Sequence, residues 1–269
     1  MRLRTPLGIA GLTRTASGRH GGSLAPWRPH ELLGRILNRV AKETTNRVDE
    51  VVAGSIRSHI GNVGRVAALD AGLDMGIPAI TVDRQCASSM EALAIAAAKV
   101  GSGLARRVLV GGVESSSRGP WFLDKTSRAF DYREPTPYEA RMSTDEVGDP
   151  SMGETAEILA DEFGIPREEM DELSLDSHRR ATRATEEGVF QNEILPLPPR
   201  GRQTEAFVRD QTIRSDTTLE KLAQLPPEQQ DGHPEESHRV GTAGARDQHP
   251  AIASPPDARF SERHLTSLH

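Results

Sequence analysis

The sequence is poor in cysteine and in long apolar runs, and each shortage excludes a class of protein. The single cysteine among 269 residues cannot form an internal disulfide, so nothing indicates an oxidising compartment. No run approaches the roughly 18 apolar residues that span a bilayer, and the N-terminus lacks the apolar core of a signal peptide. We therefore expect a cytoplasmic protein with no membrane partner.

Aromatic residues and excess positive charge are also scarce. Phe, Trp and Tyr make up 4% of the chain, which favours an aliphatic, alanine-rich α/β interior over a β-sandwich. The formal net charge is -6, and no basic stretch has the density or aromatic interleaving of a nucleic-acid surface. Nucleic acid is therefore not expected as a partner, and no residue spacing typical of a metal site occurs.

Helix and strand signals alternate along the chain up to about residue 197. Apolar residues recur at helical spacing in some segments, whereas short β-branched runs between them are typical of buried strands. Helices are expected at 29–43, 62–72, 89–101, 151–164 and 166–188, and strands at 48–56, 78–83 and 106–113. The repeated strand, helix, strand order predicts parallel pairing and a layered α/β fold.

Two segments have a different composition. Residues 119–150 contain four prolines and mixed charges, so we expect a loop excursion from the core of a domain over 1–225. Residues 226–269 hold only ten apolar residues, together with six prolines and five of the nine histidines. Such a segment buries too little surface to offset its ordering entropy, and we expect it to be largely disordered.

The only cysteine lies in the stretch DRQCASSMEAL, at position 86. Ser88 and Glu91 have capping-box spacing, which predicts a helix from about Ser89. Cys86 would then occupy a turn between a strand and a helix N-terminus, where unpaired backbone N–H groups stabilise a thiolate. A lone cysteine is also commonly a small buried hydrophobe, so this spacing alone leaves both roles open.

The stretch VDRQCASSMEALAIAAAKVGSGLARRVLVGGVESSSRGP, at 82–120, resembles the active-cysteine segment of the thiolases. This family comprises acetyl-CoA acetyltransferases and 3-ketoacyl-CoA thiolases. Further similar motifs occur in order at 13–33 and 151–197, so the resemblance covers about Leu12 to Pro227. It implies the N-terminal domain of a thiolase, with layered helices on a mixed, mostly parallel sheet. The departures from the family pattern are Asp83, Ser89 and Ser116.

The resemblance also implies an activity. Cys86 would be the nucleophile that carries an acyl group, Met152 would line the acyl pocket, and Arg214 would contact the nucleotide end of coenzyme A. Coenzyme A thioesters would be substrates, with no resident cofactor. The family further implies a homo-oligomer and a role in fatty acid and lipid metabolism.

Family members continue with a second half that supplies an asparagine, a histidine and a second cysteine. This chain has no second cysteine, and neither of its His-Pro pairs fits the histidine motif. We hypothesise a truncated thiolase whose tail is not thiolase sequence, as a shifted reading frame would produce; an evolved C-terminal extension is the alternative.

Two functions are compatible with this hypothesis. The first is an acyltransferase that forms or cleaves 3-ketoacyl-CoA through a Cys86 acyl-enzyme, impaired by the loss of the second half. The second is a non-catalytic thiolase-like module that binds acyl-CoA or a thiolase partner. Because a lone half would expose an apolar face, we also expect oligomers or poor solubility.

Two other polar residues are assigned structural roles. Glu114 follows an expected strand and is predicted to fix its loop by hydrogen bonds. His178 lies in a charged helical context, which indicates a residue at the protein boundary.

Overall fold

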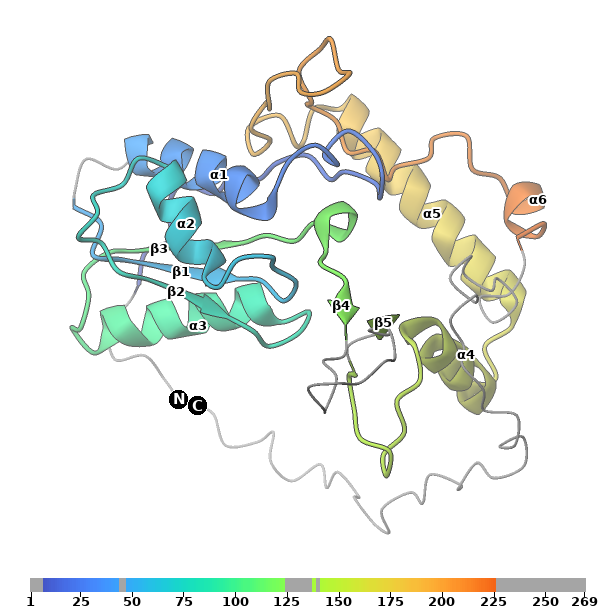
Figure 1. Ribbon diagram of the computed structural model, residues 1–269. Coiled ribbons are helices and arrows are strands. Elements are labelled where there is room, and N and C mark those ends of the chain that lie inside the picture. Colours follow the sequence, from blue (N-terminus) through green and yellow to red (C-terminus); the bar gives the residue numbers. More distant parts are fainter. Residues whose placement is uncertain (1–6, 44–46, 124–136, 139–140, 226–269) are drawn as a thin grey trace, which may run out of the picture. The chain divides into compact units, whose positions relative to one another are not determined.

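The computed structural model describes residues 7–43, 47–123, 137–138 and 141–225. Its central sheet has three parallel strands, β1 (Glu50–Gly54), β2 (Ala79–Val82) and β3 (Val108–Gly112), in the order β2-β1-β3 (Figure 1). In register, Val52 of β1 lies opposite Ile80 and Val110. The predicted α/β class and its parallel pairing are therefore confirmed.

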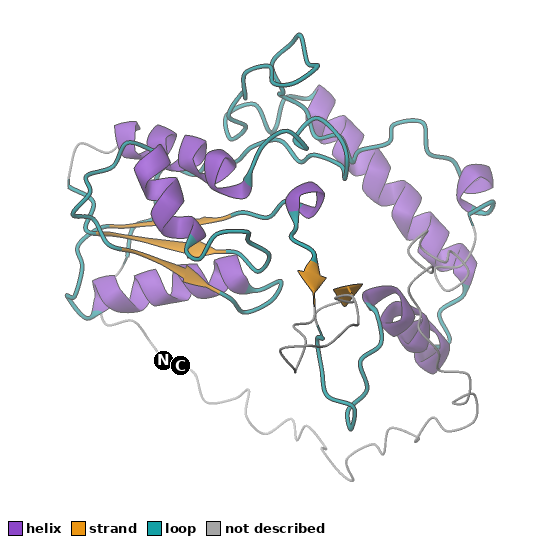
Figure 2. Cartoon of the chain, viewed as in Figure 1, coloured by secondary structure: helices purple, strands orange, loops and turns teal. Residues whose placement is uncertain are grey.

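Helices cover both faces of this sheet (Figure 2). On one face lie α1 (Pro29–Glu43) and α2 (Val63–Asp70), which also pack against each other, and on the other lies α3 (Ser88–Gly101). Proline is tolerated at the first position of α1 because its missing N–H would have no helical partner there. The helical periodicity thus placed α1, α2 and α3 within a few residues of their observed bounds.

The main core lies between the sheet and the α1–α2 layer and contains only aliphatic side chains. Its buried members are Leu33, Leu37, Val48, Val51, Ala53, Val63, Ala67, Ala68, Ala71 and Leu109. A second cluster joins segments far apart in the sequence, through Ala16, Trp27, Leu32, Leu197 and Phe207. The expected alanine-rich, aliphatic interior is present in the main core.

Two elements are less buried than their sequences suggest. Every residue of β2 is only half-buried, because β2 is an edge strand of the described sheet. In α3, the buried residues are Ser88, Ala92 and Ala96, whereas Met90 is 76% exposed. Small residues therefore form the packing face of α3, and its larger apolar side chains do not.

The remaining described elements follow β3 along the chain. They are η1 (Ser116–Arg118), β4 (Phe122–Leu123), β5 (Pro137–Tyr138), α4 (Met152–Phe163), α5 (Arg167–Glu186) and α6 (Leu219–Leu222). The excursion over 119–150 lies partly outside the described residues, and the tail over 226–269 lies wholly outside them. Both stay predictions.

The ends of α4 follow from its sequence. Ser151 and Glu154 form a capping box, in which each side chain accepts a hydrogen bond from the other residue's backbone N–H (3.2 and 2.8 Å). Gly164 ends the helix at φ 62°, a left-handed conformation that favours glycine. The sequence analysis predicted this helix but not its capping box.

An ion pair connects the N-terminal segment to a loop nearly two hundred residues later. The Arg14 guanidinium donates hydrogen bonds to both carboxylate oxygens of Asp210 (2.8 and 3.0 Å) and one to Glu193 (2.6 Å). Asp210 also accepts the backbone N–H of Ser17 (2.6 Å). The bond from Arg14, with that from Ser17, lowers the pKa of Asp210 although burial opposes the shift.

Asp210→Asn should lower the free energy of unfolding at pH 7 by about 1.5–3 kcal/mol, because a charged acceptor is lost. The carboxylate stabilises the fold above its unfolded-state pKa of about 4, and this contribution disappears as the pH falls through the lowered folded-state pKa. The unfolding free energies of the variant and the native chain, measured in urea, should therefore converge as the pH falls below about 4 and through the lowered folded-state pKa. A difference in unfolding free energy that does not change with pH would contradict a stabilising role of the Asp210 carboxylate. The control is Glu205→Gln, which changes an exposed carboxylate.

Candidate active site

Cys86 lies in the turn that joins β2 to the first residue of α3, and it is exposed. The predicted location of the cysteine, between a strand and a helix N-terminus, is therefore correct. Its exposure is also the opposite of what a small core hydrophobe would show.

The backbone of this turn adopts an unusual conformation. Gln85 has φ +51°, which makes it the sole described non-glycine residue with a positive φ and a position of local strain. The Asp83 carboxylate accepts the backbone N–H of Gln85 (2.9 Å). The Ser88 hydroxyl accepts the N–H of Arg84 (2.8 Å) and donates to the carbonyl of Gln85 (2.5 Å). These bonds hold the strained turn in one conformation.

The predicted capping box of Ser88 and Glu91 is wrong. Helix α3 already begins at Ser88, its N-cap is Ala87, and no side chain caps it. Because Gln85 is left-handed, the Ser88 hydroxyl instead bonds two backbone groups that precede the helix, the N–H of Arg84 and the carbonyl of Gln85. Glu91 forms an ion pair with Arg84 and does not reach the N-cap. The Ser88 hydroxyl therefore stabilises the turn that carries Cys86. Glu91 contacts the same turn through its ion pair with Arg84.

Two glycines allow the first turn of α3 to approach the sheet. They are Gly54 and Gly112, the last residues of β1 and β3. A β-carbon at position 54 would lie 2.5 Å from the backbone nitrogen of Ser89 and 2.6 Å from the carbonyl carbon of Ser88. A β-carbon at position 112 would overlap the Ser89 side chain. The sequence analysis missed both residues, although glycine inside a strand pattern is a known sign of close backbone approach.

The helix start provides unpaired hydrogen-bond donors. The backbone N–H groups of Ala87, Ser88 and Glu91 bond to carbonyls of the turn and its flank. Those of Ser89 and Met90 have no hydrogen-bond partner in the described part of the chain. Unpaired donors at a helix N-terminus stabilise negative charge nearby, as a thiolate or a developing oxyanion requires.

Met152 and Arg214 lie on other elements. Met152 is the first residue of α4 and is 63% exposed. Arg214 is exposed, and its backbone N–H donates to Nδ1 of His178 (3.3 Å). Within the described ranges, no hydrogen bond or ion pair joins Cys86, Met152 and Arg214. Their assignment to one site therefore stays a prediction.

The hydrogen bonds predicted for Glu114 are present, and His178 lies at the protein boundary, as expected. The Glu114 carboxylate accepts the backbone N–H groups of Ile56 and Arg57 (2.9 and 3.0 Å) and so ties the loop after β1 to the end of β3. His178 is half-buried on α5.

The described helices and side chains include neither a membrane-spanning element nor a cluster of metal ligands. None of these helices combines the length and apolarity needed to cross a membrane. Over the same residues, no three His, Cys, Asp or Glu side chains gather where they could hold a metal ion.

Comparison with known proteins decides the family. The profile described as thiolase, N-terminal domain, matches residues 7–233. The chain belongs to the thiolase family.

Individual relatives agree with this assignment. VraB of Staphylococcus aureus (strain MRSA252), provisionally described as an acetyl-CoA C-acetyltransferase, is 33% identical over 222 residues, which are 81% of this chain and 58% of VraB. VraB of Staphylococcus epidermidis (strain ATCC 35984) is 36% identical over 228 residues, 84% of this chain and 59% of that protein. The chain thus spans just under three fifths of the length of these relatives.

A solved structure shows the same fold. The crystal structure of the Bacillus anthracis acetyl-CoA acetyltransferase is 33% identical, with a TM-score of 0.70. The alignment covers 80% of this chain and 57% of that protein. The thiolase-like N-terminal fold expected from the sequence is confirmed.

Gly54→Ala should destabilise the protein by about 1–3 kcal/mol, because the added methyl group meets the backbone at the start of α3. The matched control is Gly61→Ala, since a β-carbon there meets nothing within 4 Å. Chemical denaturation of both variants measures the effect. Equal stability of the two would show that α3 does not need this close approach.

Ser88→Ala should loosen the cysteine turn, because the backbone N–H of Arg84 loses its acceptor and the carbonyl of Gln85 keeps only the backbone N–H of Ser88 as a donor. We expect native Cys86 to react with iodoacetamide faster than a free-cysteine peptide, and Ser88→Ala to reduce this advantage. Ser89→Ala, which changes the exposed neighbouring hydroxyl, should leave the rate unchanged. A native rate equal to that of the peptide would contradict an activated thiol.

Proposed function

We propose that this chain is an acyltransferase of the thiolase type and that Cys86 receives the acyl group from an acyl-CoA thioester. The observation that carries the proposal is the exposed Cys86 in a rigid turn beside the unpaired N–H groups of Ser89 and Met90. The family assignment and the names of its relatives support the same chemistry.

The proposed step divides a carbon–carbon bond exchange into two transfers. The Cys86 thiolate attacks the thioester carbonyl carbon, and a new carbon–sulfur bond forms. The tetrahedral intermediate then collapses, the bond to coenzyme A breaks, and coenzyme A leaves as a thiolate that takes up a proton. In synthesis, the α-carbon of a second acetyl-CoA loses a proton and attacks the carbonyl carbon of the acyl-enzyme, and the bond to Cys86 breaks as the thiolate leaves. In cleavage, the Cys86 thiolate attacks the 3-keto carbon of 3-ketoacyl-CoA, the bond between carbons 2 and 3 breaks, and acetyl-CoA leaves once its α-carbon takes up a proton. Coenzyme A then attacks the acyl-enzyme and accepts the acyl group.

Two further residues have proposed roles in substrate binding. Met152 would contact the acyl chain, for which its exposed thioether is chemically suited. The exposed Arg214 guanidinium would bind a phosphate of coenzyme A.

A binding module without turnover is the second candidate. Among the described residues, no histidine forms a hydrogen bond with Cys86 that could activate its thiol. Such a module would bind acyl-CoA or an intact thiolase without completing the exchange.

Assembly into a homo-oligomer, a cytoplasmic location and a role in lipid metabolism are further proposals from the family. Met90 and Leu93 leave an apolar face of α3 exposed, at 76% and 44% of their surfaces. Such a face would favour self-association.

Incubation with acetoacetyl-CoA and coenzyme A tests the two functions. The acyltransferase should consume acetoacetyl-CoA and form two molecules of acetyl-CoA, and Cys86→Ala should abolish this. We expect slow turnover by the 269-residue chain. A binding module would show calorimetric binding of acetyl-CoA by both variants and no turnover, whereas neither binding nor turnover would contradict both functions.

A further inference from the structure

Arg214, the proposed contact with coenzyme A, lies in a segment over residues 212–225. Its guanidinium forms no hydrogen bond or ion pair within the part of the chain that the structure describes. The nearby acid Asp216 is paired with Lys221 (2.6 Å) and leaves the arginine uncompensated. An exposed guanidinium without a partner can bind a phosphate. The place at which it does so depends on what holds the backbone of Arg214.

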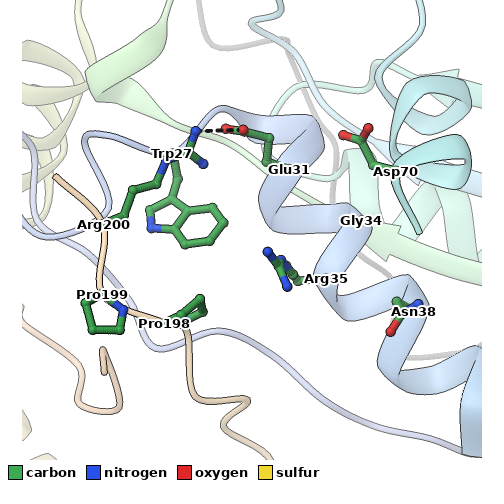
Figure 3. Close-up of a pocket in the computed structure, with 9 residues that line it drawn as sticks. All are labelled: Trp27, Glu31, Gly34, Arg35, Asn38, Asp70, Pro198, Pro199 and Arg200. Carbon is green, nitrogen blue, oxygen red and sulfur yellow. Dashed lines mark hydrogen bonds and ion pairs between the residues drawn. The ribbon is translucent and has the colours of Figure 1, made fainter. Parts of the chain in front are cut away.

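The chain before this segment is anchored to the N-terminal part of the protein. Arg200 donates to Glu31 of α1 (2.8 Å), as Figure 3 shows, and its guanidinium carbon lies 4.6 Å from the centroid of the Trp27 ring. Further along, the backbone N–H of Gln211 donates to the carbonyl of Ser17 (2.8 Å). The segment therefore starts from a fixed point.

The end of the segment is anchored to α5. The guanidinium of Arg167, the first residue of α5, donates to the carbonyls of Leu222 and Leu225 (2.7 and 3.1 Å). Asp171, one turn along the helix, accepts a hydrogen bond from Arg167 (2.9 Å) and so fixes that guanidinium. The beginning of α5 therefore holds the end of α6.

Between these two anchors, His178 holds the backbone of Arg214. The backbone N–H of Arg214 donates to Nδ1 of His178 (3.3 Å), whereas its carbonyl accepts the N–H and the hydroxyl of Thr217 (3.3 and 2.9 Å). Over the described chain, the hydrogen bonds that join residues 212–225 to other parts of the protein come from Arg167 and His178 alone. His178 is therefore the only such anchor at Arg214 itself.

Both anchors project from the same side of α5. Position 178 follows position 167 by about three helical turns, which is about 16 Å along the helix axis. Because nearly whole turns separate the two positions, their side chains leave the helix in similar directions. The 20-residue helix α5 thus holds the segment at two separate points, the end of α6 and the backbone of Arg214.

The hydrogen bond to Arg214 requires a neutral imidazole. A ring nitrogen that accepts a hydrogen bond carries no proton, so the proton of the neutral ring lies on Nε2. His178 is half-buried and supplies an acceptor to a backbone N–H that has no other partner in the described chain.

We propose that His178 is a positioning residue for coenzyme A, because it holds the backbone of Arg214 and thereby the guanidinium that meets a phosphate. This inference rests on the proposed function of Arg214. His178 itself does not contact the substrate. Without its acceptor, the segment keeps its anchor at α6, but the backbone at Arg214 gains freedom. Binding of coenzyme A must then restrain this backbone at a cost in conformational entropy.

Three variants separate the acceptor from the rest of the side chain. His178→Leu removes the acceptor, whereas His178→Asn places an amide oxygen near the position of Nδ1. Ser177→Ala is the matched control, because Ser177 is exposed on the same helix and forms no hydrogen bond with described residues. Each variant and the native 269-residue chain are titrated with coenzyme A by calorimetry, at about pH 8 so that imidazole groups are neutral.

We expect His178→Leu to weaken the affinity for coenzyme A about three- to tenfold, the range that one neutral hydrogen bond supports. His178→Asn should recover most of the native affinity, and Ser177→Ala should not change it. Without coenzyme A, backbone hydrogen exchange of the peptide that contains Arg214 should be faster in His178→Leu and close to native in His178→Asn. Mass spectrometry measures this exchange.

The failure of this role can be distinguished from the failure of the proposed function. Native affinity in His178→Leu, while Arg214→Gln weakens binding, would overturn the positioning role and leave the proposed function standing. Unchanged exchange of the Arg214 peptide in His178→Leu, or an Asn variant as weak as the Leu variant, would also overturn the positioning role. If the native chain binds no coenzyme A, the proposed function fails and the positioning role fails with it.

Discussion

The structure depends on one close approach, the contact between the first turn of α3 and the glycines that end β1 and β3. Gly54 and Gly112 leave room for the backbone of Ser88 and the side chain of Ser89 at the carboxyl edge of the sheet. Ligands of parallel α/β sheets typically bind outside this edge. The glycines therefore place the Cys86 turn at this edge, and the Ser88 hydroxyl and Asp83 carboxylate hold its strained backbone.

Much of the fold could be predicted because its signals are local. The apolar periodicity of α1 and the β-branched runs of β1 and β3 gave their positions from sequence alone. The face of α3 that packs against the sheet could not be predicted from apolar periodicity. Its closeness to the sheet requires small residues, so Ala92 and Ala96 are buried while the more hydrophobic Met90 is exposed. β2 is half-buried because it lies at the edge of the described sheet. The sequence of a single strand does not determine its place in the strand order.

In the candidate site too, some features could be predicted from local sequence and others could not. The position of Cys86 followed from its flanking strand and helix, whereas its proposed role as a nucleophile came from the family resemblance. The partners of Ser88 did not follow, because they depend on the left-handed conformation of Gln85, which no local rule assigns to glutamine. Contacts such as Arg14 with Asp210, or Trp27 with Arg200, join residues too far apart in sequence for any spacing argument.

The central claim is that the folded turn makes Cys86 an acyl acceptor. The most direct measurement is to incubate the chain with acetyl-CoA and locate the acetyl group by mass spectrometry of its peptides. The account predicts a thioester on Cys86 in the folded protein and none when the chain is incubated in denaturant. Equal acetylation in both states, or no acetylation of Cys86 in the folded chain, would contradict it.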